Sequence, residues 1–348
     1  MFICSNKLSS IFIQVTKYLS IHKDDIIRLQ FTIQGFKNRL PEKYFIIPDR
    51  PLIFRLVTKM NFDTCFPVRN ELGEGPIYDG KTAELIWFDI VGQTMFVGNT
   101  NEETIRSQGF GEPVSAAFLT NSDVLLVAAA SGVIAFDRKT GRRATNFPIE
   151  ANNSLTRSND SRAAPNNAIW LGTMGLSQES GAGSIYHLRS GICTRLFEGI
   201  SVPNAICFSP DGETAYFCDT PKRMIMRTRI ASETSLPVGR PSVFIDLTSE
   251  KLNPDGAVID SEGSLWNAQW GAGRVACYDS SGCFVRAIKL PATQITCPAF
   301  GGPDLKRLYV TSAYEEISRS EQPEAGAVFM IEVDVPGLAE RRVDLKQD

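Results

Sequence analysis

The sequence predicts an all-β protein folded as a six-bladed β-propeller, with four-stranded blades around a central channel. Helical periodicity is nearly absent after residue 60, and one pattern recurs six times: a short apolar strand, a turn rich in Gly, Asp or Asn, and a second strand centred on an aromatic residue or Leu. These centres lie 39, 44, 46, 50 and 43 residues apart, at Trp87, Leu126, Trp170, Tyr216, Trp266 and Tyr309. Periods of about 40 to 50 residues are typical of propeller blades.

Further apolar runs follow most of these units, and we expect them to form the outer strands of the blades. They lie at residues 183–188, 224–230, 274–279 and 327–333. A ring of blades must also be closed, because an unpaired sheet edge invites aggregation. We therefore expect residues 62–68, which precede the first unit, to supply the outer strand of the last blade. A β-sandwich is the alternative fold, but its strands would not repeat at this period.

The first 59 residues differ from the rest of the chain. They hold 10 Lys and Arg against 4 Asp and Glu, a net charge of +6, whereas the remaining 289 residues carry −9. Only Gly35 of the 27 glycines lies there. The segment lacks the unbroken apolar stretch and small-residue cleavage site of an export signal, and its charge is too thinly spread to predict nucleic-acid binding. We interpret residues 1–59 as an appendage or a misplaced translation start, with Met60 as the working start, and residues 60–348 as the propeller.

Cysteine usage and hydropathy favour a cytoplasmic protein with no membrane partner. The eight cysteines form no C-x-x-C pair, and several fall within strand-like runs, so we expect reduced, buried thiols. The longest near-continuous apolar stretch, residues 124–136, is broken by Ser131 and Gly132 and is shorter than the roughly 20 residues that span a bilayer. The sequence carries no signal for the oligomeric state.

Aligning the six repeats places polar residues near the axis. Counted back from the strand centres, the corresponding positions hold Glu74, Asn159, Asn204 and Asp255, while the second and sixth blades offer Val114 or Ser115 and Cys297. Innermost strands line the channel, so these side chains should converge. Buried carboxylates would repel each other unless a cation lay among them, and oxygen ligands favour Ca²⁺, then Mg²⁺ or Mn²⁺. The alternative is that Asn204 and Asp255 are only turn residues in Pro-Asn and Pro-Asp-Gly.

Several motifs resemble the senescence marker protein, regucalcin and gluconolactonase family. They are GEGP at 73–76, RSND at 157–160 with LGTM at 171–174, PNAICFSPDG at 203–212, PDGAVIDSEGSLW at 254–266 with AQWGAGRV at 268–275, and QPEAGAVF at 322–329. The resemblance runs from about Leu72 to Val333. One departure occurs in the third repeat, where Pro165, Asn166, Asn167 and Ala168 replace a turn that often contains Asp and Gly.

The resemblance implies a sugar lactone lactonase, a hydrolase of carbohydrate metabolism that converts a small aldonolactone such as gluconolactone to the open-chain acid. It also implies that Glu74, Asn204 and Asp255 bind one divalent metal ion, with Asp255 as the catalytic base. Arg157 and Asn159 would bind the substrate. Ca²⁺ is the first candidate, with Mn²⁺, Mg²⁺ or Zn²⁺ as alternatives.

Other hydrolytic machinery is poorly supported by the sequence. It contains two histidines, His22 in the N-terminal segment and His187 in a strand where we expect a structural role, and it lacks a G-x-S-x-G elbow, a P-loop and a G-x-G-x-x-G motif. A phosphotriesterase-like propeller is a rival enzyme class, but we would expect a histidine in its channel. A non-enzymatic calcium-binding regulator would keep the same ligands and stays open as an alternative; an interaction platform would need no polar axis.

Overall fold

The computed structural model describes residues 45–47, 50–52 and 62–344. Contacts divide the chain into two units, Met1–Lys59 and Met60–Asp348. The described residues of the first unit form one antiparallel pair, β1 (Phe45–Ile47) and β2 (Arg50–Leu52). Most of residues 1–59, including His22, lies outside the described residues, so the interpretation of this segment as an appendage or misplaced start stays a prediction.

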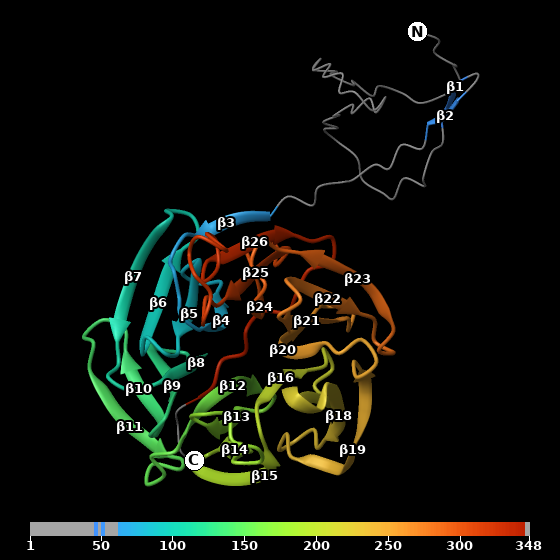
Figure 1. Cartoon of the computed structure of the whole chain (residues 1–348). Helices are drawn as coiled ribbons and strands as arrows, with labels where there is room; N and C mark the ends of the chain where they lie inside the picture. The colour runs from blue at the N-terminus through green and yellow to red at the C-terminus, as the bar shows by residue number, and fades with distance from the viewer. Residues whose placement is uncertain (1–44, 48–49, 53–61, 345–348) are drawn as a thin grey trace. The chain divides into compact units, whose positions relative to one another are not determined.

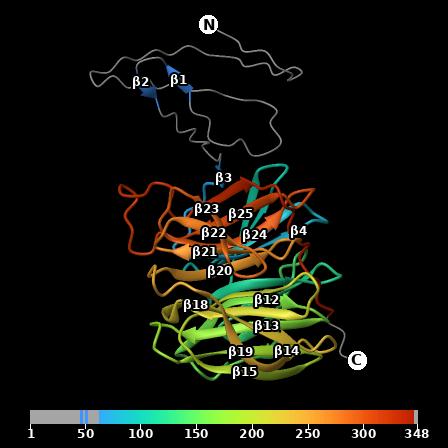
Figure 2. The ribbon, with the colours of Figure 1, turned by 90° about the vertical axis from the view of Figure 1, so that its right-hand side faces the viewer.

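The second unit is a ring of six four-stranded antiparallel sheets (Figures 1 and 2), which confirms the predicted propeller. Blades 1 to 3 contain β4 (Gly73–Asp79), β5 (Glu84–Asp89), β6 (Thr94–Asn99) and β7 (Thr104–Gly109); β8 (Val114–Leu119), β9 (Val124–Ala129), β10 (Gly132–Asp137) and β11 (Arg143–Pro148); and β12 (Thr156–Ala164), β13 (Ala168–Gly175), β14 (Gly183–Arg189) and β15 (Ile192–Ile200).

Blades 4 to 6 follow the same antiparallel order from the axis outward. They contain β16 (Pro203–Phe208), β17 (Thr214–Asp219), β18 (Met224–Ile230) and β19 (Pro237–Asp246); β20 (Asn253–Ile259), β21 (Leu265–Trp270), β22 (Arg274–Tyr278) and β23 (Phe284–Lys289); and β24 (Ile295–Gly301), β25 (Arg307–Ser312), β26 (Val328–Glu332) and β3 (Phe62–Phe66). One short 3₁₀ helix, η1 (Thr220–Lys222), connects β17 to β18.

The six predicted strand centres all lie on the second strand of their blades, and none of these side chains is more than 7% exposed. The apolar core is divided into six clusters, and each cluster is made mainly of side chains from two neighbouring blades. Each sheet therefore buries one apolar face against the preceding blade and the other against the next. Stability depends on every blade having both neighbours, so the ring has to be closed.

Ring closure occurs as the sequence predicts. Strand β3 pairs antiparallel with β26, so residues before the first blade complete the last one. The pairing carries Phe66 into the cluster between blades 6 and 1, where its ring stacks on that of Trp87 with centroids 5.1 Å apart. Phe66 is 1% exposed. The start and the end of the propeller are thus held by one sheet and one apolar cluster.

The apolar runs expected to be outer strands are instead third strands, β14, β18, β22 and β26. In five blades a fourth strand follows, and several of these are largely exposed and polar, such as β7 with the sequence TIRSQG. An exposed edge strand has one face in solvent and lacks the apolar signal of a buried strand. Hydropathy alone therefore identifies the inner three strands better than the outermost one.

The seven cysteines in the described part of the chain are free, as expected, but Cys193 and Cys283 are exposed rather than buried. Cys193 lies on the outermost strand β15, and Cys283 directly precedes the outermost strand β23. Their positions at the rim of the ring explain their exposure. No helix among the described residues is long and apolar enough to cross a membrane.

Replacing Phe66 by Ala should destabilise the closed ring. Removal of a fully buried phenylalanine ring costs about 3 to 5 kcal/mol, because transfer free energy is lost and a cavity remains. We expect the free energy of unfolding, measured by urea denaturation, to fall by that amount. Asp63→Asn, at an exposed position of the same strand, is the matched control and should change it by less than about 0.5 kcal/mol. Equal stability of the parent and Phe66→Ala would contradict the role of β3 in closure.

Candidate active site on the axis of the ring

All six innermost strands carry a register shift close to the end where they begin. Such bulges bend a strand and change the direction of its side chains. Measured from the first paired residue after the shift, Glu74 and Asn204 lie three residues earlier, whereas Asn159 and Asp255 lie two residues earlier. The four residues expected at equivalent positions therefore occupy two different register positions.

Backbone geometry at two of the bulges allows this arrangement. Gly75, directly after Glu74, has a φ of 54°, and a Cβ placed on it would lie 1.9 Å from the carbonyl oxygen of Ser115 in the next blade. Only glycine fits such a conformation and so close an approach. Ala205, directly after Asn204, has a φ of 55°, which is uncommon for a residue with a side chain. Each of these two residues with positive φ thus directly follows a polar residue near the axis.

Glu74 and Asp255 form a pair of buried carboxyl groups. Their side chains come from blades 1 and 5, are 8% and 5% exposed, and are hydrogen-bonded to each other. One oxygen of each accepts the amide hydrogen of the following glycine, Gly75 or Gly256, at 3.0 Å. Burial, followed by the negative charge of Asp160, raises the pKa of Glu74 to about 8. Burial and the charge of Glu74 raise the pKa of Asp255 well above its usual range.

Arg157, Asn159 and Asn204 form a hydrogen-bonded chain beside this pair. Nη1 of Arg157 donates to Oδ1 of Asn159 at 2.8 Å, and Nδ2 of Asn159 donates to Oδ1 of Asn204 at 3.0 Å. Nδ2 of Asn204 continues the chain to Oγ1 of Thr220 at 2.9 Å. Burial lowers the pKa of Arg157 to about 10, although Glu74, Glu315 and Asp255 act in the opposite direction. The structure thus brings together all five residues that the sequence analysis selected.

Asp160 is a buried acid that the sequence analysis did not select. It is 8% exposed, its Oδ2 accepts the amide hydrogen of Ile206 at 2.7 Å, and burial raises its pKa to about 6 despite the nearby positive charge of Arg162. The sequence contained a signal for both Asp160 and Arg162. RSNDSR at 157–162 is a run of six polar residues where the innermost strand of blade 3 was expected to be apolar.

The donor set suits a hard divalent cation. Two carboxyl groups and the amide oxygen of Asn204 offer only oxygen ligands, and burial together with neighbouring negative charge raises the pKa of both carboxyl groups. Within residues 45–47, 50–52 and 62–344, no group of three or more His, Cys, Asp or Glu side chains is arranged to hold a metal ion. The candidate set therefore depends on the asparagine as its third ligand.

Other parts of the structure offer less chemistry. His187, the one histidine in the described part of the chain, lies on the third strand of blade 3, where its Nε2 is 2.8 Å from the carbonyl oxygen of Thr234, in keeping with the expected structural role.

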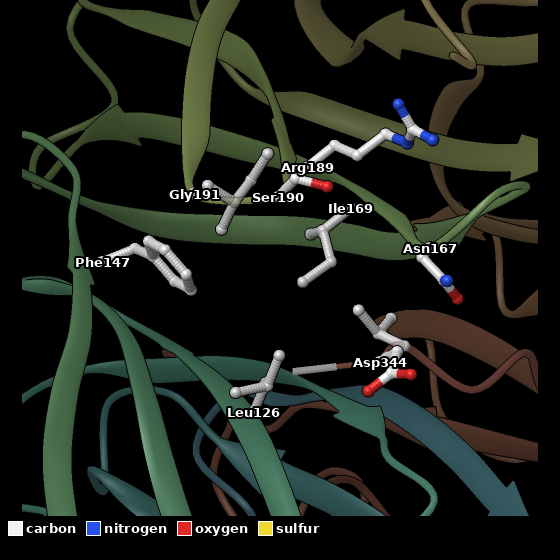
Figure 3. Close-up of a pocket in the computed structure, with 10 residues that line it drawn as sticks. Leu126, Phe147, Asn167, Ile169, Arg189, Ser190, Gly191 and Asp344 are labelled. Atoms are coloured by element: carbon white, nitrogen blue, oxygen red, sulfur yellow. The ribbon is translucent and has the colours of Figure 1, made fainter. Parts of the chain in front are cut away.

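A narrow cavity between blades 2 and 3 is lined by Leu126, Ile169 and Asp344 among others (Figure 3). Its volume of about 20 Å³ is close to the space of one water molecule, too small for a sugar lactone.

The part of the chain that forms the ring is similar to known proteins over most of its length. The SMP-30/Gluconolactonase/LRE-like region matches residues 72–314. A Rhizobium meliloti protein assigned the role of a sugar lactone lactonase is 40% identical over 78% of this chain and 93% of its own length, and the L-arabinolactonase of Azospirillum brasilense is 33% identical over 79% and 92%. The crystal structure of a calcium-binding protein, regucalcin, from Agrobacterium tumefaciens has a TM-score of 0.79 and 39% identity, covering 81% of this chain and 96% of that one.

The raised pKa of Glu74 predicts how the metal-free protein responds to pH. The folded state keeps a proton until about pH 8, whereas the unfolded chain releases it near 4.5. Folding therefore binds protons over that interval, and stability falls as pH rises, by up to about 1.4 kcal/mol per pH unit. Glu74→Gln mimics the protonated carboxyl and should lose less stability between pH 5.5 and pH 8. The measurement is urea denaturation with a chelator present; identical pH dependence in parent and variant would contradict this electrostatic account.

Proposed function

Because the chain belongs to the SMP-30/gluconolactonase/LRE-like family, we propose that it hydrolyses a sugar lactone, an aldonolactone such as gluconolactone, to the open-chain acid at the axis of the ring. The observation that carries the proposal is the pairing of two buried carboxyl groups, Glu74 and Asp255, beside the Arg157–Asn159–Asn204 chain. Two relatives named for lactone hydrolysis align with this chain over 93% and 92% of their own length.

In this proposal Glu74, Asn204 and Asp255 hold one divalent ion, with Ca²⁺ as the first candidate and Mn²⁺, Mg²⁺ or Zn²⁺ as alternatives. When bound, such an ion would polarise the lactone carbonyl and lower the pKa of water. Asn204 is well placed to contribute an amide oxygen, since its Nδ2 is already fixed by Thr220, and Thr220 in turn donates to the carbonyl oxygen of Pro254 at 2.7 Å. The hydrogen bonds from Asn204 to Thr220 and from Thr220 to Pro254 together link β16, which carries Asn204, to β20, which carries Asp255.

Arg157 and Asn159 bind the substrate in the proposed mechanism. The guanidinium of Arg157 is anchored by two contacts of Nη1 at 2.8 Å, to the carbonyl oxygen of Ser158 and to Oδ1 of Asn159. Its other nitrogen atoms can donate to the carbonyl and hydroxyl oxygens of a lactone and fix its orientation. The positively charged guanidinium, fixed in this position, also stabilises the negative charge that develops on the carbonyl oxygen of the lactone.

Asp255 accepts the proton of the attacking water. Hydrolysis forms a bond between the water oxygen and the lactone carbonyl carbon and breaks the bond from that carbon to the ring oxygen, which takes up a proton. A carboxylate within hydrogen-bond reach of the attacking water can serve as its general base. The hydrogen bond from the Gly256 amide to Oδ1 keeps the side chain in one orientation.

Two other functions remain distinguishable by experiment. A calcium-binding regulator would use the same ligands, and relatives named regucalcin from Gallus gallus and Danio rerio are 29% and 28% identical to this chain. Such a protein would bind the ion without turnover. A phosphotriesterase-like reaction is less favoured, because no histidine among the described residues approaches the axis.

Asp255→Asn should remove lactonase activity without unfolding the protein. It keeps the size and the hydrogen bond from Gly256 but lacks the base, so kcat should fall by about 10² to 10⁴. The assay is hydrolysis of a panel of aldonolactones with Ca²⁺, Mn²⁺ or Zn²⁺ added to chelator-treated protein.

The matched control is Asp279→Asn, which removes a carboxylate from an exposed turn of the same blade and should leave kcat unchanged. Undiminished turnover by Asp255→Asn, or full activity of the chelator-treated parent, would contradict the proposed site. Ion binding by a parent that hydrolyses no member of the panel would favour the regulator.

A further inference from the structure

The segment that follows the last blade crosses the ring at the end opposite the candidate site. We call residues 334–344 the C-terminal strap; it leaves β26 and runs across the face of the ring (Figure 1). It contacts the ends of innermost strands or the turns after them in several blades: the carbonyl oxygen of Pro336 accepts from the Ser261 amide, and the amide of Val343 donates to the carbonyl oxygen of Leu119. The site residues lie at the beginning of those strands.

One side chain of the strap forms a largely buried ion pair with an innermost strand. Oε2 of Glu340 lies 2.9 Å from Nη1 of Arg162, and the two side chains are only 14% and 10% exposed. No other ion pair of Arg162 occurs within the described residues, and its Nε is buried without a hydrogen-bond partner. Within the described residues Glu340 therefore supplies the one ion pair that orients the Arg162 guanidinium, in addition to a hydrogen bond to a backbone carbonyl.

Arg162 connects two strands that carry site residues. It lies on β12, three residues after Asn159, and its Nη2 donates at 3.4 Å to the carbonyl oxygen of Ala257, two residues after Asp255 on β20. Asp160 of β12 is tied to β16 in the same way, through the amide of Ile206, two residues after Asn204. These contacts form a second layer directly beneath the candidate site.

We propose that Glu340 is a positioning residue for this site: through Arg162 it fixes the spacing of β12 and β20, and hence of the ion and substrate ligands above them. This inference rests on the proposed function. Replacing a residue that is hydrogen-bonded to a metal ligand typically changes metal affinity 10-fold to 100-fold, and because Glu340 acts from farther away, through Arg162 and the Ala257 carbonyl, we expect an effect at the lower end of that range. Loss of one partner of a buried ion pair also leaves an uncompensated charge.

The strap has other attachments, so loss of the Glu340 carboxylate should leave it in place. The Arg342 guanidinium forms an ion pair with Asp79 and donates to the carbonyl oxygen of Thr120 at 2.6 Å. Val343 is 4% exposed, packs with the cluster between blades 2 and 3 and lines the narrow cavity between these blades. Glu340→Gln is therefore a local change within a docked segment.

The test measures Ca²⁺ and Mn²⁺ binding to chelator-treated full-length protein by calorimetry. Glu340→Gln should weaken binding of the ion about tenfold, and Arg162→Met should weaken it at least as much. Because Glu340 acts through Arg162, adding Glu340→Gln to Arg162→Met should change the affinity by less than about twofold. Asp334→Asn, at an exposed position of the strap, is the matched control and should bind like the parent.

Parent-like affinity of a folded Glu340→Gln variant would overturn the inference, as would multiplicative effects of the two substitutions, which indicate independent roles. If Arg162→Met does not fold, Arg162→Gln, which also lacks the positive charge, takes its place in the cycle. Lactone turnover by the parent tests the proposed function separately: a parent that binds the ion but hydrolyses no lactone would contradict the reaction, whereas the affinities would still decide the role of Glu340. A parent that binds neither ion would overturn both.

Discussion

Two carboxyl groups buried face to face at the axis are the constraint on which the candidate site depends. Glu74 and Asp255 come from blades that are not adjacent in the chain, and each is nearly removed from solvent. Such a pair is unfavourable when both groups are ionised, so the metal-free protein keeps a proton there, as the raised pKa of each group indicates. A divalent cation would replace that proton. Because the ion would relieve the repulsion between the two buried carboxylates, the pair would favour ion binding.

The architecture supplies this convergence and keeps it rigid. Six inter-blade clusters hold each sheet on both faces, and pairing of β3 with β26 closes the ring, so the innermost strands cannot spread apart independently. Bulges at the start of those strands then turn neighbouring residues toward the axis. At the opposite end, the strap and its Glu340–Arg162 pair connect the same strands again. The site is therefore held from the side by packing and from beneath by hydrogen bonds.

Much of this was predictable because a propeller repeats. The strand centres and the closing strand follow from period and hydropathy, and the five selected residues follow from their place in the repeat and from the resemblance. The outermost strands of blades 1 to 5 were not predictable from hydropathy, since a strand such as β7 is almost wholly exposed. The two register positions of Glu74 and Asp255 depend on bulges, which counting from a strand centre cannot detect. Glu340 lies 178 residues from Arg162, and no local pattern links them.

Anomalous diffraction from crystals grown with Mn²⁺ tests the central claim most directly. The account predicts one strong peak on the axis, within about 2.0 to 2.5 Å of oxygen atoms of Glu74, Asn204 and Asp255, as oxygen-ligated divalent ions require. Crystals that show no peak there, or a peak at a site that none of these three side chains touches, would contradict it.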